Sequence, residues 1–530
     1  MNGKNLTRIC VPVCPRSANE LKSAIERAAA LGDIVELRLD CLAPNELASL
    51  QPELQALLGS LSCHAIVTLR PAEEGGRREI DNLTRIIFWT QFFSGEPAAN
   101  AFADIEIDLA LYFQERERDG RNVLDWQRVI CSHHDFTGAP TDLTELYERM
   151  SATPAGILKI AVMANELTDC LPLFQLLDRA RHEGRQLIAV AMGAAGILTR
   201  ILGPARGSYL TYGALDPDNQ TAPGQISAAE LRELYRIDGL ERGAMITGLI
   251  GSPVAHSVSP QMHNAAFRAL DLNAVYMPLE VQRLPEFARR MAHPRTRELD
   301  WNLRGLSVTA PHKSAIMEHL DWVEPPAREI GAVNTVVFDD DGLRGFNTDV
   351  EAFVDTLRDK LGTLEGSRCA IIGAGGAARG LLWGLQREGA KTTVFARAVE
   401  RARPLAEKFG ADCAPLVDAR FDGFDVVVNT TPLGTRGPLE ASTAASAEQL
   451  RGARLAYDLV YNPAVTRFMR EAQRAGCATT NGLSMLVAQA AAQFALWTGM
   501  KAPFELMREA AQSAIAASSS TVVEKQADEN

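Results

Sequence analysis

The stretch from Thr221 to Asn264 decides how this chain is organised. It begins with Thr221-Ala-Pro-Gly-Gln225 and ends with Ser257-Val-Ser-Pro-Gln-Met-His-Asn264. Between these loops lie a helical run, a short charged link and an apolar strand that begins at Met245. Both loops offer small hydroxyls and backbone N–H donors, which suit a carboxylate. We interpret the first loop as the end of one enzyme and the second as the beginning of another.

Size and composition narrow the class of protein. With 530 residues, the chain is long enough for two or three domains. Its 46% apolar and 23% charged residues are typical of soluble globular protein. The net charge of −12 argues against nucleic acid as a partner, because phosphate binding needs a basic face. No apolar run reaches the roughly 18 residues that a membrane span requires, so we expect no membrane association.

The cysteines and the chain ends add further expectations. The nine cysteines are scattered, without a Cys-x-x-Cys pair, which predicts free thiols and no metal site. We therefore expect a reducing compartment, cytoplasmic or plastid stroma. The N-terminus lacks a long apolar signal core. Residues 516–530 are small, polar and charged, which predicts a disordered tail. The expected assembly is a monomer or a homodimer.

Strand and helix patterns alternate over the first 236 residues. Apolar strand patterns begin at Ile9, Ile34, Ala65, Phe102, Val129, Gly156, Leu187 and Ser208. Amphipathic helical runs separate them, for example residues 19–31 and 167–182. Eight such units predict an α/β fold of the (β/α)₈ barrel type, with a doubly wound sheet as the alternative.

Polar residues collect after these strands, at the end of a barrel where chemistry takes place. They are Glu36, Arg38 and Asp40 on the second strand, Arg70 and Glu74 after the third, His133, His134 and Asp135 after the fifth, Arg200 after the seventh and Thr221 to Gln225 after the eighth.

Lys159 stands out because it lies inside the apolar strand Ile157-Leu-Lys-Ile-Ala-Val162. Burial favours the neutral amine, which is a nucleophile. The alternative is a lysine whose head group reaches solvent between helices. A buried amine, a histidine and two arginines together predict a site that fixes an acid and attacks its ketone.

Four motifs of this half resemble the type I 3-dehydroquinate dehydratase family. They are Glu36-Leu-Arg38, Ser132-His-His-Asp-Phe136, Leu158-Lys-Ile-Ala-Val162 and Ala222-Pro-Gly-Gln225, which occur in the family's order over residues 5–238. The resemblance implies that Lys159 forms a Schiff base with the substrate's C3 ketone. It implies that His134 moves the C2 proton and protonates the departing C1 hydroxyl, with Glu74 orienting His134.

The remaining residues of that site are implied to bind substrate. Arg70, Arg200 and Gln225 would hold the carboxylate and hydroxyls, Glu36 and Arg38 would line the floor, and Thr221 stands where many relatives have serine. His133 should point away. The site is expected to use neither metal nor cofactor.

In the second half, polar groups again follow apolar strands. Ser257 and Ser259 precede a helix that starts near Pro260, and this arrangement suits an anion, although a simple helix cap is the alternative. Further strand ends carry Val308-Thr-Ala-Pro-His-Lys313, Val333-Asn-Thr335 and Asn347-Thr-Asp349.

A nucleotide-binding pattern begins at Cys369. The order is strand, Gly373-Ala-Gly-Gly-Ala-Ala378, then helix, as a dinucleotide-binding fold requires. The next strand ends at Arg397, with Arg401 beyond it, where an NAD site has an acid. Arginine suits a 2′-phosphate, so we expect NADP(H); an exposed arginine at a helix start is the alternative.

These second-half motifs resemble the shikimate dehydrogenase family over about residues 245–510. The resemblance implies that Lys313 and Asp349 are the catalytic pair and that Ser257 and Ser259 bind the carboxylate. It implies the following further contacts: Thr309, Asn334, Gln489, Tyr461 and Gln493 to substrate, and Gly373, Gly375, Gly376, Ala377, Arg397, Arg401, Thr430 and Met485 to cofactor. The chain departs from the family at Ser307, usually Asn, at Ala396-Arg-Ala398, usually Asn-Arg-Thr, and at Ser484, commonly Gly.

Together the two halves resemble consecutive steps of the shikimate pathway, in the order of the fused plant-type enzymes. We expect a dehydratase barrel over residues 1–240, a substrate domain over 241–350 completed by helix 483–515, and a Rossmann NADP-binding domain over 351–482. The substrates are expected to be 3-dehydroquinate, 3-dehydroshikimate and shikimate. A dehydratase joined to a quinate dehydrogenase, a ligand-sensing regulator derived from these enzymes and, for the barrel alone, a Schiff-base aldolase are the alternatives.

Overall fold

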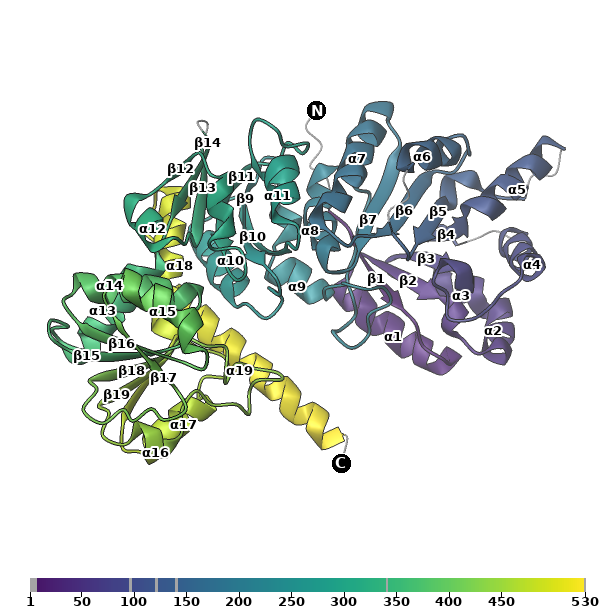
Figure 1. Ribbon diagram of the computed structural model, residues 1–530. Coiled ribbons are helices and arrows are strands. Elements are labelled where there is room, and N and C mark those ends of the chain that lie inside the picture. The colour runs from purple at the N-terminus through teal and green to yellow at the C-terminus, as the bar shows by residue number, and fades with distance from the viewer. Residues whose placement is uncertain (1–6, 95–97, 120–122, 139–141, 340–341, 529–530) are drawn as a thin grey trace. The chain divides into compact units, whose positions relative to one another are not determined.

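The computed structural model describes residues 7–528 apart from 95–97, 120–122, 139–141 and 340–341 (Figure 1). The chain forms two compact units. The first contains Met1–Ala244 with the short segments Leu279–Ala292 and Thr296–Trp301, and the second contains Met245–Pro278, His293–Arg295 and Asn302–Asn530.

The first unit is a parallel barrel with helices outside it (Figure 1). Its strands are β1 (Ile9–Val13), β2 (Ile34–Arg38), β3 (His64–Thr68), β4 (Ala101–Glu106), β5 (Val129–Asp135), β6 (Ile157–Met163), β7 (Gln186–Met192) and β8 (Thr211–Tyr212). They pair in the order β7-β6-β5-β4-β3-β2-β1-β8, and a bridge between Leu187 and Ser208 joins the two ends. The predicted barrel is confirmed, and the doubly wound alternative is wrong for this half.

The outer helices bury one apolar face each. They are α1 (Ala18–Leu31), α2 (Pro44–Leu50), α3 (Leu54–Gly59), α4 (Asn82–Phe93), α5 (Ile107–Arg118), α6 (Leu143–Ser151), α7 (Leu171–Glu183), α8 (Ile197–Leu202) and α9 (Ala228–Glu233). Helix α1 starts where the side chain of Ser17 accepts from the Glu20 N–H, and it buries Leu21, Ile25 and Ala28. That spacing is one stripe of a helix, which packs on the barrel wall.

The cysteine prediction is wrong at one pair. Cys14, just after β1, and Cys41, just after β2, form a disulfide with their Cα atoms 5.3 Å apart. The other seven cysteines are free. Because β1 and β2 pair in parallel, residues 27 positions apart meet at the same end of the barrel. The spacing of the cysteines alone does not reveal this contact.

The second unit begins with a mixed six-stranded sheet in the order β10-β9-β11-β13-β14-β12. Its strands are β9 (Met245–Gly251), β10 (Ala274–Glu280), β11 (Leu303–Val308), β12 (Trp322–Val323), β13 (Thr335–Asp339) and β14 (Gly342–Phe346). Helices α10 (Ser259–Ala269), α18 (Leu483–Thr498) and α19 (Phe504–Asp528) share one buried cluster that includes Met262, Phe494 and Met507. The C-terminal helices therefore pack on the same core as residues just after Met245.

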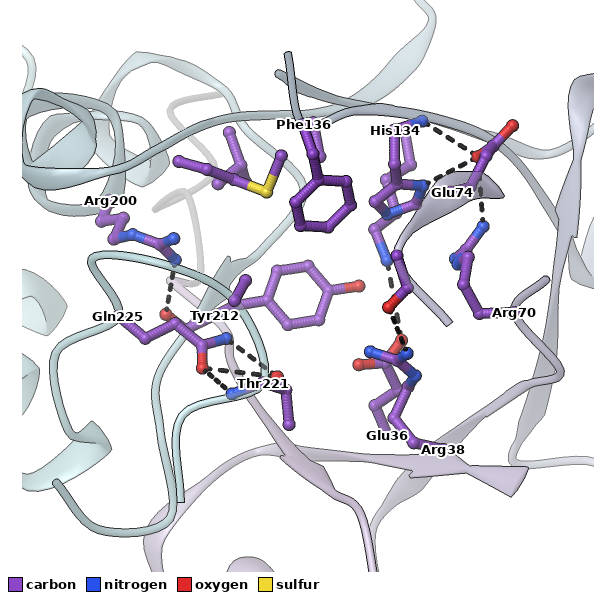
Figure 2. Close-up of a pocket in the computed structure, with 16 residues that line it drawn as sticks. Glu36, Arg38, Arg70, Glu74, His134, Phe136, Arg200, Tyr212, Thr221 and Gln225 are labelled. Atoms are coloured by element: carbon purple, nitrogen blue, oxygen red, sulfur yellow. Dashed lines mark hydrogen bonds and ion pairs between the residues drawn. The ribbon is translucent and has the colours of Figure 1, made fainter. Parts of the chain in front are cut away.

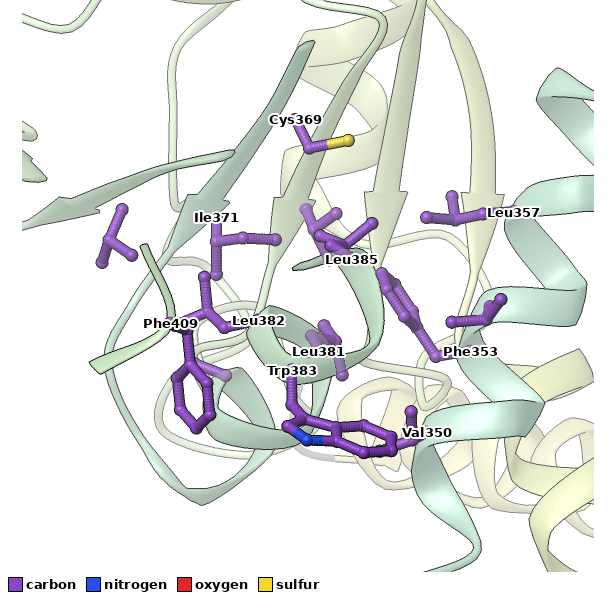
Figure 3. Close-up of a cluster of buried hydrophobic side chains, with 14 of the residues drawn as sticks. Val350, Phe353, Leu357, Cys369, Ile371, Leu381, Leu382, Trp383, Leu385 and Phe409 are labelled. Atoms are coloured by element: carbon purple, nitrogen blue, oxygen red, sulfur yellow. The ribbon is translucent and has the colours of Figure 1, made fainter. Parts of the chain in front are cut away.

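The rest of the second unit is a doubly wound parallel sheet. Its order, β17-β16-β15-β18-β19-β20, is that of a dinucleotide-binding fold. The strands are β15 (Arg368–Ile372), β16 (Lys391–Ala396), β17 (Asp412–Pro415), β18 (Val426–Asn429), β19 (Leu455–Asp458) and β20 (Ala478–Asn481). Helices α13 (Asp349–Leu361), α14 (Gly376–Arg387) and α15 (Val399–Lys408) cover one core, where Phe353, Leu381 and Ile371 pack together (Figure 3).

The C-terminal stretch differs from the sequence prediction. Helix α19 continues to Asp528, across most of the stretch 516–530 that the composition predicts to be disordered. Met507, Ala511 and Ile515 are buried four residues apart, so this face anchors the helix, and the following Ala, Glu, Lys and Gln residues favour helix. Residues 529–530 lie outside the described part. None of the described helices has the length and apolar character that crossing a membrane requires.

Candidate active sites

The first site lies at the carboxyl ends of the barrel strands. All nine barrel residues to which the sequence assigns catalysis or binding line one cavity: Glu36, Arg38, Arg70, Glu74, His134, Lys159, Arg200, Thr221 and Gln225. In Figure 2, Arg200, Thr221 and Gln225 lie on one side, and His134, Glu74 and Arg70 on the other. His133, one position along β5, does not line the cavity.

Lys159 is buried in β6, with 4% of its surface exposed. Its Nζ lies 2.8 Å from Asp104 Oδ2 and 3.6 Å from Glu36 Oε1. The ring of Tyr212 lies below the same nitrogen, with its centroid 4.5 Å away. Two carboxylates and an aromatic face all stabilise positive charge at this atom. The site is therefore built for an ammonium or an iminium at Lys159.

His134 and Glu74 form a pair beside this amine. His134 Nδ1 lies 3.2 Å from Glu74 Oε2, and the His134 backbone N–H donates to the same oxygen at 3.0 Å. Burial, with Arg70 and Lys159 nearby, holds the pKa of His134 well below its usual value, so the ring is neutral. Burial raises the pKa of Glu74 to about 7. A neutral imidazole fixed at Nδ1 leaves Nε2 free to take a proton.

Arg70 is more deeply anchored than a substrate-binding role requires. Its Nη1 donates to Glu106 Oε1 and Ser132 Oγ at 2.9 Å, and its Nη2 donates to Asp104 Oδ1 at 2.8 Å. It also lies 3.6 Å from Glu74 Oε2. The guanidinium thus links the acid beside Lys159 to the acid beside His134. These ion pairs fix Arg70 between the surroundings of Lys159 and those of His134.

Arg200 is a buried cation that lines the same cavity. It is 1% exposed, and its Nη atoms donate to the backbone carbonyls of Tyr212 and Pro223 at 3.5 and 3.2 Å. Burial lowers its pKa to about 10, and among the described residues no acid pairs with it. A buried cation without a counter-charge favours an anionic ligand. Gln225 lies beside it and is held by Thr221, whose backbone N–H donates to Gln225 Oε1 at 2.8 Å.

The floor of the cavity carries a fixed ion pair. Arg38 Nε and Nη2 donate to the two oxygens of Asp40, both at 2.9 Å. This bidentate contact fixes the plane of the guanidinium and leaves its remaining donors toward the cavity.

The sequence prediction misses several of these residues. Asp104 and Glu106 complete the charge network, while Phe136 and Tyr212 line the cavity. A signal for the two acids exists, because they lie two apart in the apolar strand β4 and so share its inner face.

The second site is a cavity of about 660 Å³ within the second unit. Eleven predicted residues line it: Ser257, Ser259, Thr309, Lys313, Asn334, Asp349, Ala377, Tyr461, Met485, Gln489 and Gln493. The predicted Gly373, Gly375, Gly376, Arg397, Arg401 and Thr430 lie outside this lining, on the nucleotide fold.

Lys313 and Asp349 meet in this cavity. Lys313 Nζ lies 2.6 Å from Asp349 Oδ2, and both side chains are about four-fifths buried, with 21% and 15% exposed. Asp349 begins α13, and its backbone N–H donates to Asn347 Oδ1 at 3.1 Å. The aspartate is thus fixed by the start of a helix and positions the ammonium.

The loop that carries Ser257 and Ser259 is held by a hydrogen bond at the start of α10. Ser257 Oγ accepts from the Ser259 N–H at 3.2 Å. Burial raises the pKa of Tyr461, while a hydrogen bond to Ser257 partly offsets the effect, so the phenol stays neutral. Two serine hydroxyls and a neutral phenol make a donor-rich corner.

Gln493 and Asn334 are held by other side chains more firmly than the sequence suggests. Gln493 Oε1 accepts from Ser307 Oγ at 2.8 Å, and its Nε2 donates to Thr335 Oγ1 at 3.0 Å. Asn334 Oδ1 accepts from Thr335 Oγ1 and the Thr348 N–H, both at 2.8 Å. Ser307, a departure from the family pattern, also accepts from Tyr276 at 2.8 Å. This buried chain supports the substrate side of the cavity.

The nucleotide fold has the features that a dinucleotide needs. Gly373 has φ +110°, and a Cβ there would lie 2.7 Å from Thr430 Oγ1, so only glycine fits. A Cβ on Gly375, the N-cap of α14, would meet nothing within 4 Å, which leaves the helix start open to a pyrophosphate. Arg397 is exposed just after β16, and Arg401 is exposed in α15. These residues fit a nucleotide with a 2′-phosphate.

The two sites define the class of protein, an enzyme that joins a Schiff-base lyase to a nucleotide-dependent dehydrogenase. Family models agree with this division. Residues 9–242 match Type I 3-dehydroquinase, 249–336 the Shikimate dehydrogenase substrate binding domain, 355–458 Shikimate / quinate 5-dehydrogenase and 482–512 the Shikimate 5'-dehydrogenase C-terminal domain.

Individual relatives give the particular family. The bifunctional 3-dehydroquinate dehydratase/shikimate dehydrogenase, chloroplastic, of Arabidopsis thaliana is 34% identical over 95% of this chain and 84% of its own. The shikimate dehydrogenase (NADP(+)) of Oleidesulfovibrio alaskensis is 44% identical over 51% of this chain and 95% of its own. The chain belongs to the bifunctional 3-dehydroquinate dehydratase/shikimate dehydrogenase family.

Two solved structures are also similar. Dehydroquinate dehydratase and shikimate dehydrogenase from S. pombe AroM is 24% identical, with a TM-score of 0.42 over 96% of this chain and 98% of that one. Shikimate 5-dehydrogenase from Thermus thermophilus, in complex with NADP(H) and shikimate, is 38% identical, with a TM-score of 0.46 over 51% of this chain and 99% of that one.

Proposed function

We propose that this chain converts 3-dehydroquinate to 3-dehydroshikimate in the barrel and reduces that product to shikimate with NADPH in its second half. The observation that carries the proposal is the pairing of Lys159 and Arg200 in one cavity. The first is a buried amine beside two carboxylates, and the second is a buried cation without an acid partner among the described residues.

In the barrel, Arg200 and Gln225 bind the carboxylate and Arg38 the ring hydroxyls. The ammonium of Lys159 first gives up a proton, and the resulting amine attacks the C3 ketone. Protons that leave the nitrogen go to the former ketone oxygen, which departs as water, and an iminium forms. Asp104 and Glu36, at 2.8 and 3.6 Å, stabilise its positive charge. The iminium acidifies the C2 proton, which His134 removes. His134 then gives a proton to the C1 hydroxyl, which leaves as water, and hydrolysis of the iminium frees Lys159.

In the second half, Ser257, Ser259 and Tyr461 hold the carboxylate, with Thr309, Asn334 and Gln489 at the ring. NADPH supplies the hydride when it is bound. Lys313 gives a proton to the oxygen of the reduced ketone, and Asp349, 2.6 Å away, positions that ammonium. Gly373, Gly375, Gly376, Ala377 and Thr430 form the dinucleotide cradle, Arg397 and Arg401 bind the 2′-phosphate, and Met485 borders the nicotinamide.

The proposal extends to organisation. The dehydratase corresponds to residues 1–240, the substrate domain to 241–350 with helix 483–515, and the NADP domain to 351–482. The chain works as a monomer or homodimer in cytoplasm or plastid stroma, without nucleic acid or membrane partners. Light scattering of the purified chain and fractionation of the source cells test these two statements.

A coupled assay tests the function. Purified chain receives 3-dehydroquinate and NADPH, and shikimate is measured as product. Omission of NADPH should stop the reaction at 3-dehydroshikimate. If quinate formed from 3-dehydroquinate in place of shikimate, the second activity would be that of a quinate dehydrogenase. If the chain bound both ketones without converting them, it would be a ligand-sensing regulator derived from these enzymes.

A further inference from the structure

The disulfide between Cys14 and Cys41 lies at the mouth of the barrel, beside the dehydratase site. Cys14 follows β1, and Cys41 ends the short 3₁₀ turn η1 (Leu39–Cys41) after β2. Both cysteines are half-buried and line a second cavity of about 950 Å³. Thr221 lines this cavity and the dehydratase cavity, so the two adjoin. A small reductant can therefore reach the disulfide from solvent.

Asp40 connects this disulfide to an arginine of the dehydratase site. It precedes Cys41 in the turn and is 1% exposed. Its two carboxylate oxygens accept from Arg38 Nε and Nη2, both at 2.9 Å. Arg38 lines the dehydratase cavity, and the proposed function gives it the ring hydroxyls of the substrate. The bidentate contact means that Asp40 sets the orientation of the Arg38 guanidinium.

The same carboxylate also holds the loop that follows β3. The Arg77 backbone N–H donates to Asp40 Oδ2 at 3.0 Å, and Arg38 Nη2 donates to the Gly75 carbonyl at 3.3 Å. Donors from two segments of the chain thus converge on one buried acid. A shift of Asp40 must stretch or break hydrogen bonds to both segments.

Reduction of the disulfide moves the residue next to Asp40. Two bonded sulfur atoms lie far closer together than two thiols, which keep van der Waals separation. Cys14 or Cys41 must therefore move when the bond breaks, and Cys41 shares a three-residue turn with Asp40. In a reducing compartment, such as the one proposed for this chain, disulfides are usually transient and often sense redox state.

We infer that Asp40 is a positioning residue of the dehydratase, and that its hold on Arg38 depends on the oxidation state of the Cys14–Cys41 pair. The inference rests on the proposed dehydration, in which Arg38 binds the substrate. A dithiol is the reductant. One of its thiolates attacks a sulfur of the disulfide, and its second thiol then resolves the mixed disulfide. The chain takes up two electrons and two protons, and the reductant leaves as its own disulfide.

Kinetics of the full chain before and after treatment with dithiothreitol test the inference. Thiol titration in denaturant should count seven thiols in the air-oxidised chain and nine in the reduced chain. Treatment should raise the KM for 3-dehydroquinate by about three-fold or more. The change in kcat should be smaller, because Lys159 is held by Asp104 and His134 by Glu74. The dehydrogenase reaction should keep its kcat and KM, since no cysteine lines its cavity.

Three variants locate the effect. Cys14→Ser should have the KM of the reduced parent and no response to dithiothreitol. Cys63→Ser, which removes a free cysteine just before β3, is the matched control and should respond as the parent does. Asp40→Asn loses the charge that holds Arg38, so it should raise the KM for 3-dehydroquinate by about ten-fold. Dithiothreitol should then add less than about two-fold, because both changes act through one contact.

Several outcomes would overturn the inference. They are nine thiols in the air-oxidised chain, an unchanged KM in a chain that titrates with nine thiols, and equal losses in both activities, which would report a general loss of structure. A full response of Asp40→Asn to dithiothreitol would overturn it as well. If Cys14→Ser does not fold, recovery of the parent KM on reoxidation of the reduced chain decides. Activity of the oxidised parent on 3-dehydroquinate separately tests the dehydratase function.

Discussion

At the residue scale, Lys159 changes from an ammonium to an iminium without leaving its partners. Asp104 and Glu36 lie at 2.8 and 3.6 Å from its nitrogen and suit either cation. The positive intermediate therefore forms in a site where opposite charge is already in place, without reorganisation of solvent.

Lys159→Ala should abolish dehydration and leave reduction of supplied 3-dehydroshikimate at the parent rate, because the second site is made entirely of residues after Met245. Borohydride with 3-dehydroquinate should trap a covalent adduct on the parent, detected by mass spectrometry. Lys22→Ala, at an exposed position of α1, is the matched control and should give the full adduct. An adduct of equal yield in the Lys159 variant would remove the Schiff-base assignment.

The fall in the dehydration rate at acidic pH should reflect the titration of Glu74. Burial lowers the pKa of His134 well below its usual value, so this ring is not the group that titrates near pH 7. Burial raises the pKa of Glu74 to about 7, so dehydration should decline as pH falls through 7 and Glu74 gains a proton. In Glu74→Gln, kcat/KM should be lower at pH 8 and nearly flat from pH 6 to 8. If kcat/KM of Glu74→Gln still fell as the pH dropped below 7, the titration would belong to another group.

The same shift has a consequence for stability. The folded chain holds the Glu74 proton up to about pH 7, whereas the unfolded chain releases it near the ordinary value of 4.5. The native state binds more protons between these values, so this group makes the chain less stable as pH rises through the window. Glu74→Gln should lessen that decline in urea titrations.

Lys313→Ala should lower kcat of reduction by about 10²–10⁴-fold with a smaller effect on KM, as expected of a general acid. Asp349→Asn should resemble it, because the aspartate holds the ammonium at 2.6 Å. Both variants should dehydrate 3-dehydroquinate at the parent rate. Near-normal kcat in Lys313→Ala, measured at saturating NADPH, would limit the lysine to binding.

At the element scale, the sequence predicts strands well because their pattern is local. The predicted strand at Met245–Gly251 coincides with β9, and the eight barrel strands appear in order. Asp104 and Glu106 escape prediction, because charges inside an apolar strand show their purpose only when Arg70 and Lys159 from other strands reach them. The disulfide between Cys14 and Cys41 escapes it for the same reason, since strand pairing brings the two residues together.

The predicted site shows the same division. The motifs predict nine of the residues that line the barrel cavity. They do not predict that Arg70 is buried or that Gln493 donates a hydrogen bond to Thr335. A side chain's partners depend on three-dimensional neighbours that no local pattern encodes. Helix α19 extends beyond its prediction because its buried face lies upstream of the polar residues.

The turn after β16 should set cofactor choice. Arg397 lies there, where an acid would favour NAD. A charged contact to phosphate is worth roughly 1.5–3 kcal/mol, so we expect NADPH to be preferred over NADH by about ten-fold or more in kcat/KM. Arg397→Ala should shrink this preference, with Arg387→Ala, at the end of α14, as the control. Equal use of both cofactors by the parent would contradict the assignment.

At the scale of the whole molecule, each site draws its lining from one unit alone. The two activities should therefore separate cleanly. A mixture of Lys159→Ala and Lys313→Ala chains should convert 3-dehydroquinate to shikimate, because 3-dehydroshikimate released by one chain reaches the other through solution. Lys159→Ala alone should form no shikimate, and Lys313→Ala alone should form it only at its reduced rate. A mixture that is no faster than Lys313→Ala alone would show that the intermediate must remain on one chain.

Because Lys159 and Lys313 belong to one polypeptide, translation always delivers the two catalysts in a fixed one-to-one stoichiometry. Changes in expression multiply both steps by the same factor. The steady-state pool of 3-dehydroshikimate is therefore insensitive to gene dosage at a given supply of 3-dehydroquinate per enzyme molecule. It is governed by the ratio of two catalytic efficiencies and by the NADPH supply, so selection can adjust that pool only through substitutions in one site or the other.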